Sequence, residues 1–371
     1  MNFKCSTTDL ANAATIVSKA LPARAIPPMS TGIFLKASGK TVTLTASNYE
    51  FTIKKEINAS VKIEGEVLVD GKTFAEFIKK VSCSDVELEE NSSTHDENTE
   101  RRLKITYNDT NVLYLYCLTD KYPIIEDNTD DYDFEVSQSD FKETIERGMY
   151  CASTEDSRPS LKGCFLETRD DSLLAVSLDG YRMAIVKCGI KEKKNNLKAL
   201  IFAKTLSEIV KVIDNNEEEL KIKATKNMFF LKNGSTSIII RVMELEFYEF
   251  DGIIPKDVAT EITISKELLE KCIDRVSLMC KTGNDCLKIE VGENKITVST
   301  KTDVADIKEV VSCEKTGGDL IIAFNNRFLK DALAKCKDQT IRICIPSPVK
   351  PVTIAPLSGD KFKHIVLPIR L

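Results

Sequence analysis

The chain has 371 residues, a net charge of −5, and 42% apolar and 29% charged residues, the composition of an ordinary soluble protein. Its length exceeds that of a single core, so several domains are expected, and no apolar run is long enough to cross a membrane. Residues 1–19 lack a basic start followed by an apolar block, which argues against a signal peptide. Twelve scattered cysteines without paired spacing favour a reducing compartment, so the expected location is the cytoplasm.

A strand followed by a helix recurs along the chain. Each copy has an alternating or apolar strand and then apolar residues at helical spacing; three copies also have a Ser at the helix start and an acid in the first turn. Further runs with alternating or β-branched residues predict strands between these copies. In chain order the predicted elements are strand 3–6 with helix 9–14, strand 41–45, strand 67–69 with helix 72–78, strand 134–137 with helix 140–145, strand 200–202 with helix 204–210, strand 236–240, strand 262–265 with helix 267–273, strand 295–298, and strand 320–325 with helix 327–333.

The spacing of these copies predicts an internal triplication. The first, third and fifth strand–helix phrases start about 130 residues apart, which is a typical domain length. Each unit then has two helices and is otherwise β-rich, which predicts an α+β fold with two helices packed on β-sheet. The predicted domains are residues 1–128, 129–258 and 259–371.

Charge is unevenly distributed. Acids concentrate in residues 85–100, 126–133 and 215–219, where the first stretch is predicted to be a solvated hairpin loop and the second a linker rather than an acidic metal site. The predicted helices instead carry many cations, which together could form one basic surface. These cations are Lys19, Lys79, Lys80, Lys142, Arg147, Lys204, Lys211, Lys271, Arg275, Arg327, Lys330 and Lys335.

Catalytic signals are poor in this sequence. Its two histidines, His95 and His364, have no evident Ser or Cys partner, and no nucleotide-binding or nucleophile motif occurs. The nearest cysteine trio, Cys272, Cys280 and Cys286, lacks zinc-ligand spacing. We therefore expect no enzyme, no cofactor and no metal site.

Four stretches of the sequence follow one another along the chain. Arg24 follows the first helix, and residues 158–163 are Arg-Pro-Ser-Leu-Lys-Gly. Residues 176–184 are Val-Ser-Leu-Asp-Gly-Tyr-Arg-Met-Ala, and residues 365–371 are Ile-Val-Leu-Pro-Ile-Arg-Leu. In this order they resemble the motifs of one known family, the bacterial DNA polymerase III beta subunit or sliding clamp, which has an R-P-x-L-x-G stretch, a T-D-G-H-R-L-A signature and a final V-M-P-M-R-L. The resemblance covers the entire chain.

The resemblance implies a DNA polymerase processivity factor. Two chains would join head to tail, and six domains would form a ring around duplex DNA with the helices lining the hole. Such a lining needs diffuse positive charge and no base-edge contacts. The residues implied in DNA binding are Arg24, Lys72, Lys79, Lys142, Arg158, Lys204, Lys211, Lys271 and Arg327.

A peptide pocket between the second and third domains is also implied, through which the clamp tethers the replicative polymerase, the clamp loader and other replication or repair proteins. Its apolar walls would take short hydrophobic side chains, and its arginines the polar ends. Its residues would be Leu161, Leu178, Gly180, Tyr181, Arg182, Met183, Ile365, Leu367, Pro368, Ile369, Arg370 and Leu371, with Tyr248 and Ile253 as a third wall. Core packing is the alternative for the apolar members. Two departures are Tyr181 for the usual His and residues 246–252, which lack the family's more basic, proline-containing form.

The head-to-tail contact is expected between Leu113 and Leu115 of the first domain and Leu278 and Met279 of the third. Two alternatives remain open on the residues alone. One is a scaffold of the same fold that binds partners without encircling DNA. The other is a nucleic-acid-processing enzyme that uses the acids of residues 126–133 with Mg²⁺.

Overall fold

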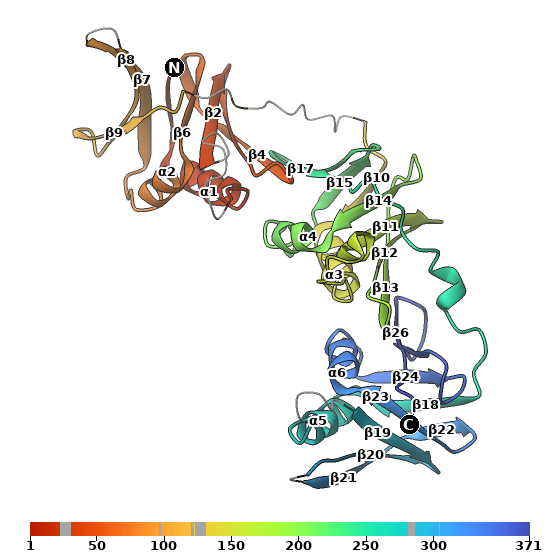
Figure 1. Cartoon of the computed structure of the whole chain (residues 1–371). Coiled ribbons are helices and arrows are strands. Elements are labelled where there is room, and N and C mark those ends of the chain that lie inside the picture. The colour runs from red at the N-terminus through yellow and green to blue at the C-terminus, as the bar shows by residue number, and fades with distance from the viewer. Residues whose placement is uncertain (23–30, 96–97, 120–121, 123–130, 281–285, 304) are drawn as a thin grey trace. The chain divides into compact units, whose positions relative to one another are not determined.

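A computed structural model describes residues 1–22, 31–95, 98–119, 122, 131–280, 286–303 and 305–371 (Figure 1). The chain forms two compact units. The first comprises residues 1–138, 191–195 and 207–242, and the second comprises residues 139–190, 196–206 and 243–371. The middle third of the chain therefore contributes to both units.

The first unit contains two antiparallel sheets. The five-stranded sheet has the order β5 (Ser60–Ile63), β1 (Asn2–Ser6), β7 (Asp85–His95), β8 (Asn98–Tyr107) and β9 (Asn111–Tyr116). The eight-stranded sheet has the order β10 (Phe134–Ser137), β15 (Glu219–Ala224), β16 (Met228–Asn233), β17 (Thr236–Arg241), β4 (Phe51–Asn58), β3 (Thr41–Ser47), β2 (Gly32–Ser38) and β6 (Gly65–Asp70).

The second unit also contains two antiparallel sheets. The nine-stranded sheet has the order β14 (Lys198–Phe202), β11 (Gly163–Arg169), β12 (Ser172–Leu178), β13 (Arg182–Gly189), β26 (Phe362–Val366), β25 (Val352–Pro356), β24 (Thr340–Ile345), β18 (Thr260–Ser265) and β22 (Glu314–Gly317). The four-stranded sheet has the order β21 (Asp306–Ser312), β20 (Lys295–Lys301), β19 (Cys286–Gly292) and β23 (Leu320–Asn325).

The helices begin where the repeated phrase predicts them. The α-helices of the described residues are α1 (Thr7–Ser18), α2 (Gly71–Ile78), α3 (Gln138–Gly148), α4 (Ala203–Ile209), α5 (Lys266–Ser277) and α6 (Asn326–Ala334). Side-chain oxygens cap four of them: Ser6 accepts from the Asp9 N–H, Asp70 from Thr73, Ser265 from Leu268, and Asn325 from Arg327 and Phe328. These caps satisfy N–H groups that have no partner within the helix. The prediction of an α+β fold from repeated strand–helix phrases is confirmed.

Two strand pairings carry the sheets across the predicted domain boundaries. In the first unit β17 pairs with β4, from Thr236 opposite Lys55 to Ile240 opposite Phe51. In the second unit β13 pairs with β26 in the same antiparallel way. Because the ladder continues through each pairing, neighbouring thirds of the chain share one hydrogen-bonded sheet.

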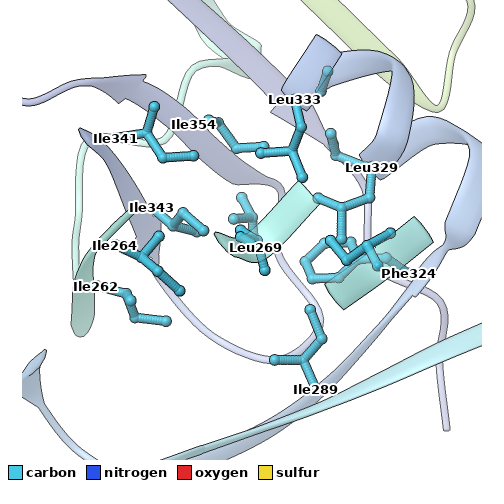
Figure 2. Close-up of a cluster of buried hydrophobic side chains, with 14 of the residues drawn as sticks. Ile262, Ile264, Leu269, Ile289, Phe324, Leu329, Leu333, Ile341, Ile343 and Ile354 are labelled. Atoms are coloured by element: carbon cyan, nitrogen blue, oxygen red, sulfur yellow. The ribbon is translucent and has the colours of Figure 1, made fainter. Parts of the chain in front are cut away.

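Branched side chains fill the core of the second unit, as Figure 2 shows. Ile262 and Ile264 of β18 and Ile341 and Ile343 of β24 meet Leu269 of α5 there. The strand residues alternate with exposed or half-buried ones, whereas α5 buries Leu269, Cys272, Ile273 and Val276 at helical spacing. Alternation along the strands and helical spacing along α5 place the apolar side chains of both in the same core.

The first acidic stretch differs from its prediction, whereas most of the second cannot be compared with its prediction. Residues 85–100 are not a loop, because β7 and β8 form most of this hairpin, and buried Val86 and Leu88 alternate with the acids. Residues 123–130, most of the predicted linker, lie outside the described residues. Asp133 at the end of that stretch is buried, and its carboxylate accepts hydrogen bonds from the Ala224 N–H at 2.8 Å and the Asn195 amide at 2.9 Å. It therefore anchors the start of β10.

His364 of β26 is a buried core residue. Its ring stacks on Phe362 at a centroid distance of 5.0 Å and meets Tyr150 edge-on at 5.3 Å. Neither ring nitrogen has a hydrogen-bond partner among the described residues. Burial lowers the pKa of His364 to about 3, and the charges of Arg147 and Lys335 act in the same direction. The imidazole is therefore neutral in the folded protein at neutral pH.

Replacing His364 with Leu should remove a pH-dependent loss of stability. The unfolded chain gains a proton on His364 below about pH 6.5, whereas the folded chain takes it only near pH 3. The stability contributed by the neutral imidazole is thus complete above pH 6.5 and is lost as the pH falls toward 3. By pH 5 the loss should reach about 2 kcal/mol, at about 1.4 kcal/mol per pH unit. Urea unfolding followed by circular dichroism between pH 7 and 5 measures it.

Val366→Ala is the matched control, since Val366 is buried on the same strand and cannot titrate. Its effect on the free energy of unfolding should be the same at both pH values. If the free-energy difference between wild type and His364→Leu stays constant from pH 7 to 5, the assignment of a neutral buried imidazole is wrong.

Candidate functional site

A tight turn connects β12 to β13 at the residues that resemble the family signature. The Asp179 carboxylate accepts hydrogen bonds from the backbone N–H groups of Tyr181 at 2.9 Å and Arg182 at 3.0 Å. Gly180 has φ = 95°, in the region that favours glycine because a Cβ is strained there. Tyr181, which follows Gly180 in this turn, is 62% exposed and faces solvent.

Arg182 has internal partners for its charge. Its side chain is only 9% exposed, and its guanidinium donates to Asp179 at 3.0 Å and to Asp331 of α6. The same group lies 4.7 Å from the centre of the Phe328 ring and 5.6 Å from that of Tyr150. The predicted contact of this arginine with a peptide stays a prediction, and in the structure its guanidinium has a structural role. It ties the turn to α6.

Several apolar residues predicted to line the pocket are buried in a core cluster beneath the surface. Leu161, Leu178, Met183 and Ile365 are all buried and belong to one cluster. Residues that the sequence reasoning missed complete this cluster: Leu174, Val176, Ile185 and Phe250, with Phe165, Phe247 and Ile254 packed against it. Leu174, Val176 and Leu178 are two residues apart on β12, as are Met183 and Ile185 on β13, so each set lies on one face of the sheet.

The chain end lies beside the Gly180 turn. Leu367 donates its N–H to the Tyr181 carbonyl at 2.8 Å, and Ile369 donates to the Ala323 carbonyl at 2.7 Å. The strand β26 ends at Val366, so the tail from Leu367 onward lies beyond the sheet strand. Leu367 and Ile369 are 36% and 38% exposed, and Leu371 is 75% exposed. The tail is thus held by its backbone while its apolar side chains face solvent.

Residues 243–254, here called the strap, follow β17 and pack on β11. Phe247 stacks on Phe165 at 5.1 Å, and Phe250 meets the same ring edge-on at 6.3 Å. These two rings hold the strap, whereas Tyr248 and Ile253, the predicted third wall, are 48% and 41% exposed. The predicted site residues of β11–β13, the strap and the tail all belong to the second unit.

Tyr181 and Phe328 form an aromatic surface beside the tail. Their ring centroids are 5.8 Å apart and the rings are stacked. Phe328 lies on α6, far from the turn in sequence, and no local pattern pointed to it. Together with the tail, these rings place several exposed apolar groups around one turn, an arrangement typical of an interaction surface.

The predicted DNA-binding cations are mostly exposed on helices. Lys72, Lys79, Lys204, Lys211, Lys271 and Arg327 are exposed on or at the ends of α2, α4, α5 and α6, and Lys142 of α3 is half-buried. Arg158 is exposed but precedes a short 3₁₀ helix (Pro159–Lys162), and Arg24 lies outside the described residues. Lys211 pairs with Glu208 and Lys271 with Glu267. Such exposed pairs are weak, so these lysines can still meet phosphate groups.

The predicted dimer contacts lie at sheet edges or beside them. Leu113 and Leu115 are half-buried on β9, an edge strand of the first unit. Leu278 ends α5 and is 76% exposed, and Met279 next to it is half-buried. In the second unit α5 packs against β20 and the edge strand β21. Exposed apolar groups beside an unpaired edge can pair with another chain.

Among the described residues, no three His, Cys, Asp or Glu side chains gather as a metal-binding group. Across the same part of the chain, no helix has the length and apolar character needed to span a membrane.

Comparison with known protein families gives one consistent result. Residues 1–111, 135–249 and 251–370 match, in that order, the N-terminal, central and C-terminal domains of the DNA polymerase III beta subunit. The chain is 27% identical to the beta sliding clamp of Staphylococcus aureus over 363 residues, which cover 95% of this chain and 94% of the relative.

Solved structures have the same fold. A DNA polymerase sliding clamp from Bacillus subtilis aligns with a TM-score of 0.91 at 23% identity, covering 100% of this chain and 99% of its own. A putative DNA polymerase III beta subunit from Eubacterium rectale aligns with a TM-score of 0.88 at 26% identity and the same coverage. The triplicated strand–helix phrase, the signature turn and the three matched domains together place this chain in the DNA polymerase III beta subunit family, the bacterial sliding clamps.

Proposed function

We propose that the chain is a DNA polymerase processivity factor that encircles duplex DNA and holds the replicative polymerase on it. The observation that carries this proposal is the ordered match of all three clamp domains along nearly the whole chain, with relatives of almost the same length. The clamp loader and other replication or repair proteins would use the same partner surface.

DNA would be held without sequence readout. The exposed lysines and arginine of α2, α4, α5 and α6 supply positive charge in a chain whose net charge is −5. Phosphate contacts from such side chains give affinity but little sequence information, so the protein can slide. Arg24, Lys142 and Arg158 belong to the same proposed set.

The ring would be a head-to-tail homodimer. Leu113 and Leu115 at the β9 edge of one copy would meet Leu278 and Met279 of the other. Burying exposed Leu278 and the half-buried Leu113, Leu115 and Met279 provides the driving force, and the two different surfaces explain why the contact is head to tail rather than self-complementary.

Partners would bind at the exposed aromatic and aliphatic groups around the Gly180 turn, the strap and the tail. The buried cluster beneath them fixes their positions, and the apolar groups on the surface could bind the hydrophobic side chains of a short linear motif. In this role the protein performs no catalysis and works in the cytoplasm. A scaffold of the same fold that does not encircle DNA is the second candidate, and the DNA experiment below separates the two.

We expect the protein to remain on nicked circular duplex DNA at a salt concentration that removes it from short linear duplex. Each phosphate contact weakens as salt rises, whereas a closed ring is held topologically. Cutting the circle should release the protein. Gel filtration of protein–DNA mixtures at high salt, before and after cutting, measures the retention. Protein that stays on the linearised DNA at high salt would exclude topological binding.

The double variant Leu278→Asp/Met279→Asp tests the ring independently, since it would bury unpaired charges in the proposed contact. Light scattering should report a monomer, and retention on circles should be lost. Leu268→Asp is the matched control, because Leu268 lies on the same helix and is 55% exposed but outside the proposed contact. A dimer that persists in the double variant rules out this interface.

Deleting Pro368 to Leu371 should abolish binding of a synthetic hydrophobic clamp-binding peptide. The deletion removes the exposed Ile369 and Leu371 and the hydrogen bond from Ile369 to Ala323. Isolated motifs of this type should bind wild type with a Kd of roughly 1 µM, about −8 kcal/mol. Isothermal calorimetry measures the loss.

Leu357→Ser serves as the control, because it removes an exposed apolar side chain from the turn between β25 and β26, at the end of β26 opposite the tail, and should leave the Kd unchanged. Dimer mass and retention on circular DNA should survive the tail deletion. Undiminished peptide affinity in the truncated protein would place the partner site elsewhere.

A further inference from the structure

The strap carries three carboxylates among its exposed apolar groups. Glu244, Glu246 and Glu249 are exposed and form no ion pair or hydrogen bond with any residue that the structure describes. Leu245 and Tyr248, which alternate with them, are 46% and 48% exposed. Large apolar groups and unpaired acids thus face solvent on one short segment.

The strap is fixed to the sheet below it. Met243 donates its N–H to the Leu200 carbonyl at 2.8 Å, and the Phe247 ring stacks on Phe165. At the other end Arg169 donates to both Asp251 oxygens, at 2.8 and 2.9 Å, and lies over the Phe250 ring at 4.9 Å. The three glutamates are therefore presented from an anchored backbone, so they can contribute to selectivity.

Two arginines near this surface do not offset these glutamates. Arg169 is paired with Asp251 and Glu167, and Arg182 with Asp179 and Asp331. Other exposed cations near this surface are Arg158, whose guanidinium lies against the Gly180 turn, Arg370 in the tail, and Lys256, two residues beyond the strap. None of them belongs to the strap, whose own unpaired charges are its three glutamates.

We propose that the strap selects partner segments in which lysine or arginine flanks the apolar anchor residues. This inference rests on the proposed partner-binding function and specifies the charge that a partner segment should carry. Tyr248, Leu245 and Ile253 would contact the apolar anchors, and Glu244, Glu246 and Glu249 would pair with the basic flank. Charges at the rim of an interface act mainly on specificity and association rate, which suits partners that must exchange.

The test is a selection of random displayed peptides on the full-length protein, on the triple variant Glu244→Gln/Glu246→Gln/Glu249→Gln and on the tail deletion. Wild type should enrich peptides with apolar anchors and adjacent lysine or arginine. The triple variant should keep the apolar preference and lose the basic one, because glutamine preserves size and removes charge. The tail deletion should enrich neither.

Calorimetry on one selected peptide gives the magnitude. Changing its basic flank to glutamate, or using the triple variant, should weaken binding about threefold to tenfold at low salt, since exposed ion pairs are individually weak, and less at high salt. The control variant Glu56→Gln/Glu293→Gln/Glu314→Gln changes the same charge on other exposed elements and should bind like wild type.

The outcomes separate the two proposals. Apolar enrichment without a basic preference, or equal affinity in the triple variant, overturns the acidic strap and leaves the partner site standing. No enrichment of apolar motifs on wild type overturns the partner site and this inference with it.

Discussion

The pairing of β13 with β26 determines the geometry of the proposed partner surface. Arg182 starts β13 opposite Val366, which ends β26. The Gly180 turn and the tail therefore leave the sheet at the same point, where Leu367 bonds to the Tyr181 carbonyl. Because side chains alternate along a strand, a shift of one residue would move Met183 and Ile365 out of the buried cluster. The register of this one strand pair therefore determines both which residues form the buried cluster and where the exposed groups of the turn and the tail lie.

The charges available to a ligand at this surface are those that are not already paired with other residues of the protein. Arg182 joins the turn to α6 through Asp179 and Asp331, and its side chain is only 9% exposed. Its loss would leave the mostly buried Asp179 carboxylate with the backbone N–H groups of the turn alone as partners. The strap glutamates have no such internal partner, so in the proposed partner site they are the carboxylates that can pair with a basic ligand.

Local signals in the sequence were sufficient to predict the helices and strands. They were insufficient to predict the long-range contacts that connect them. Caps such as Ser6 and Ser265 and the spacing of Leu269, Cys272, Ile273 and Val276 act within a few residues, so the helices were predictable. The pairing of β17 with β4 and the contact of Arg182 with Asp331, 149 residues apart, depend on tertiary packing. No periodicity encodes them. Tyr248 and Ile253 of the strap were predicted, but its anchoring was not, since the packing of Phe247 and Phe250 depends on Phe165 of another strand.

Continuous sheets also explain why a triplicated sequence forms two compact units. If each repeat closed its own sheets, three separate cores would result. Here the middle repeat gives β10 and β15–β17 to the eight-stranded sheet and β11–β14 to the nine-stranded sheet. Its edge strands are thereby paired with β4 and β26 instead of being left open, which removes edges that could bind other chains. The five-stranded and four-stranded sheets keep β9 and β21 as edge strands, and a head-to-tail dimer needs free edges of this kind.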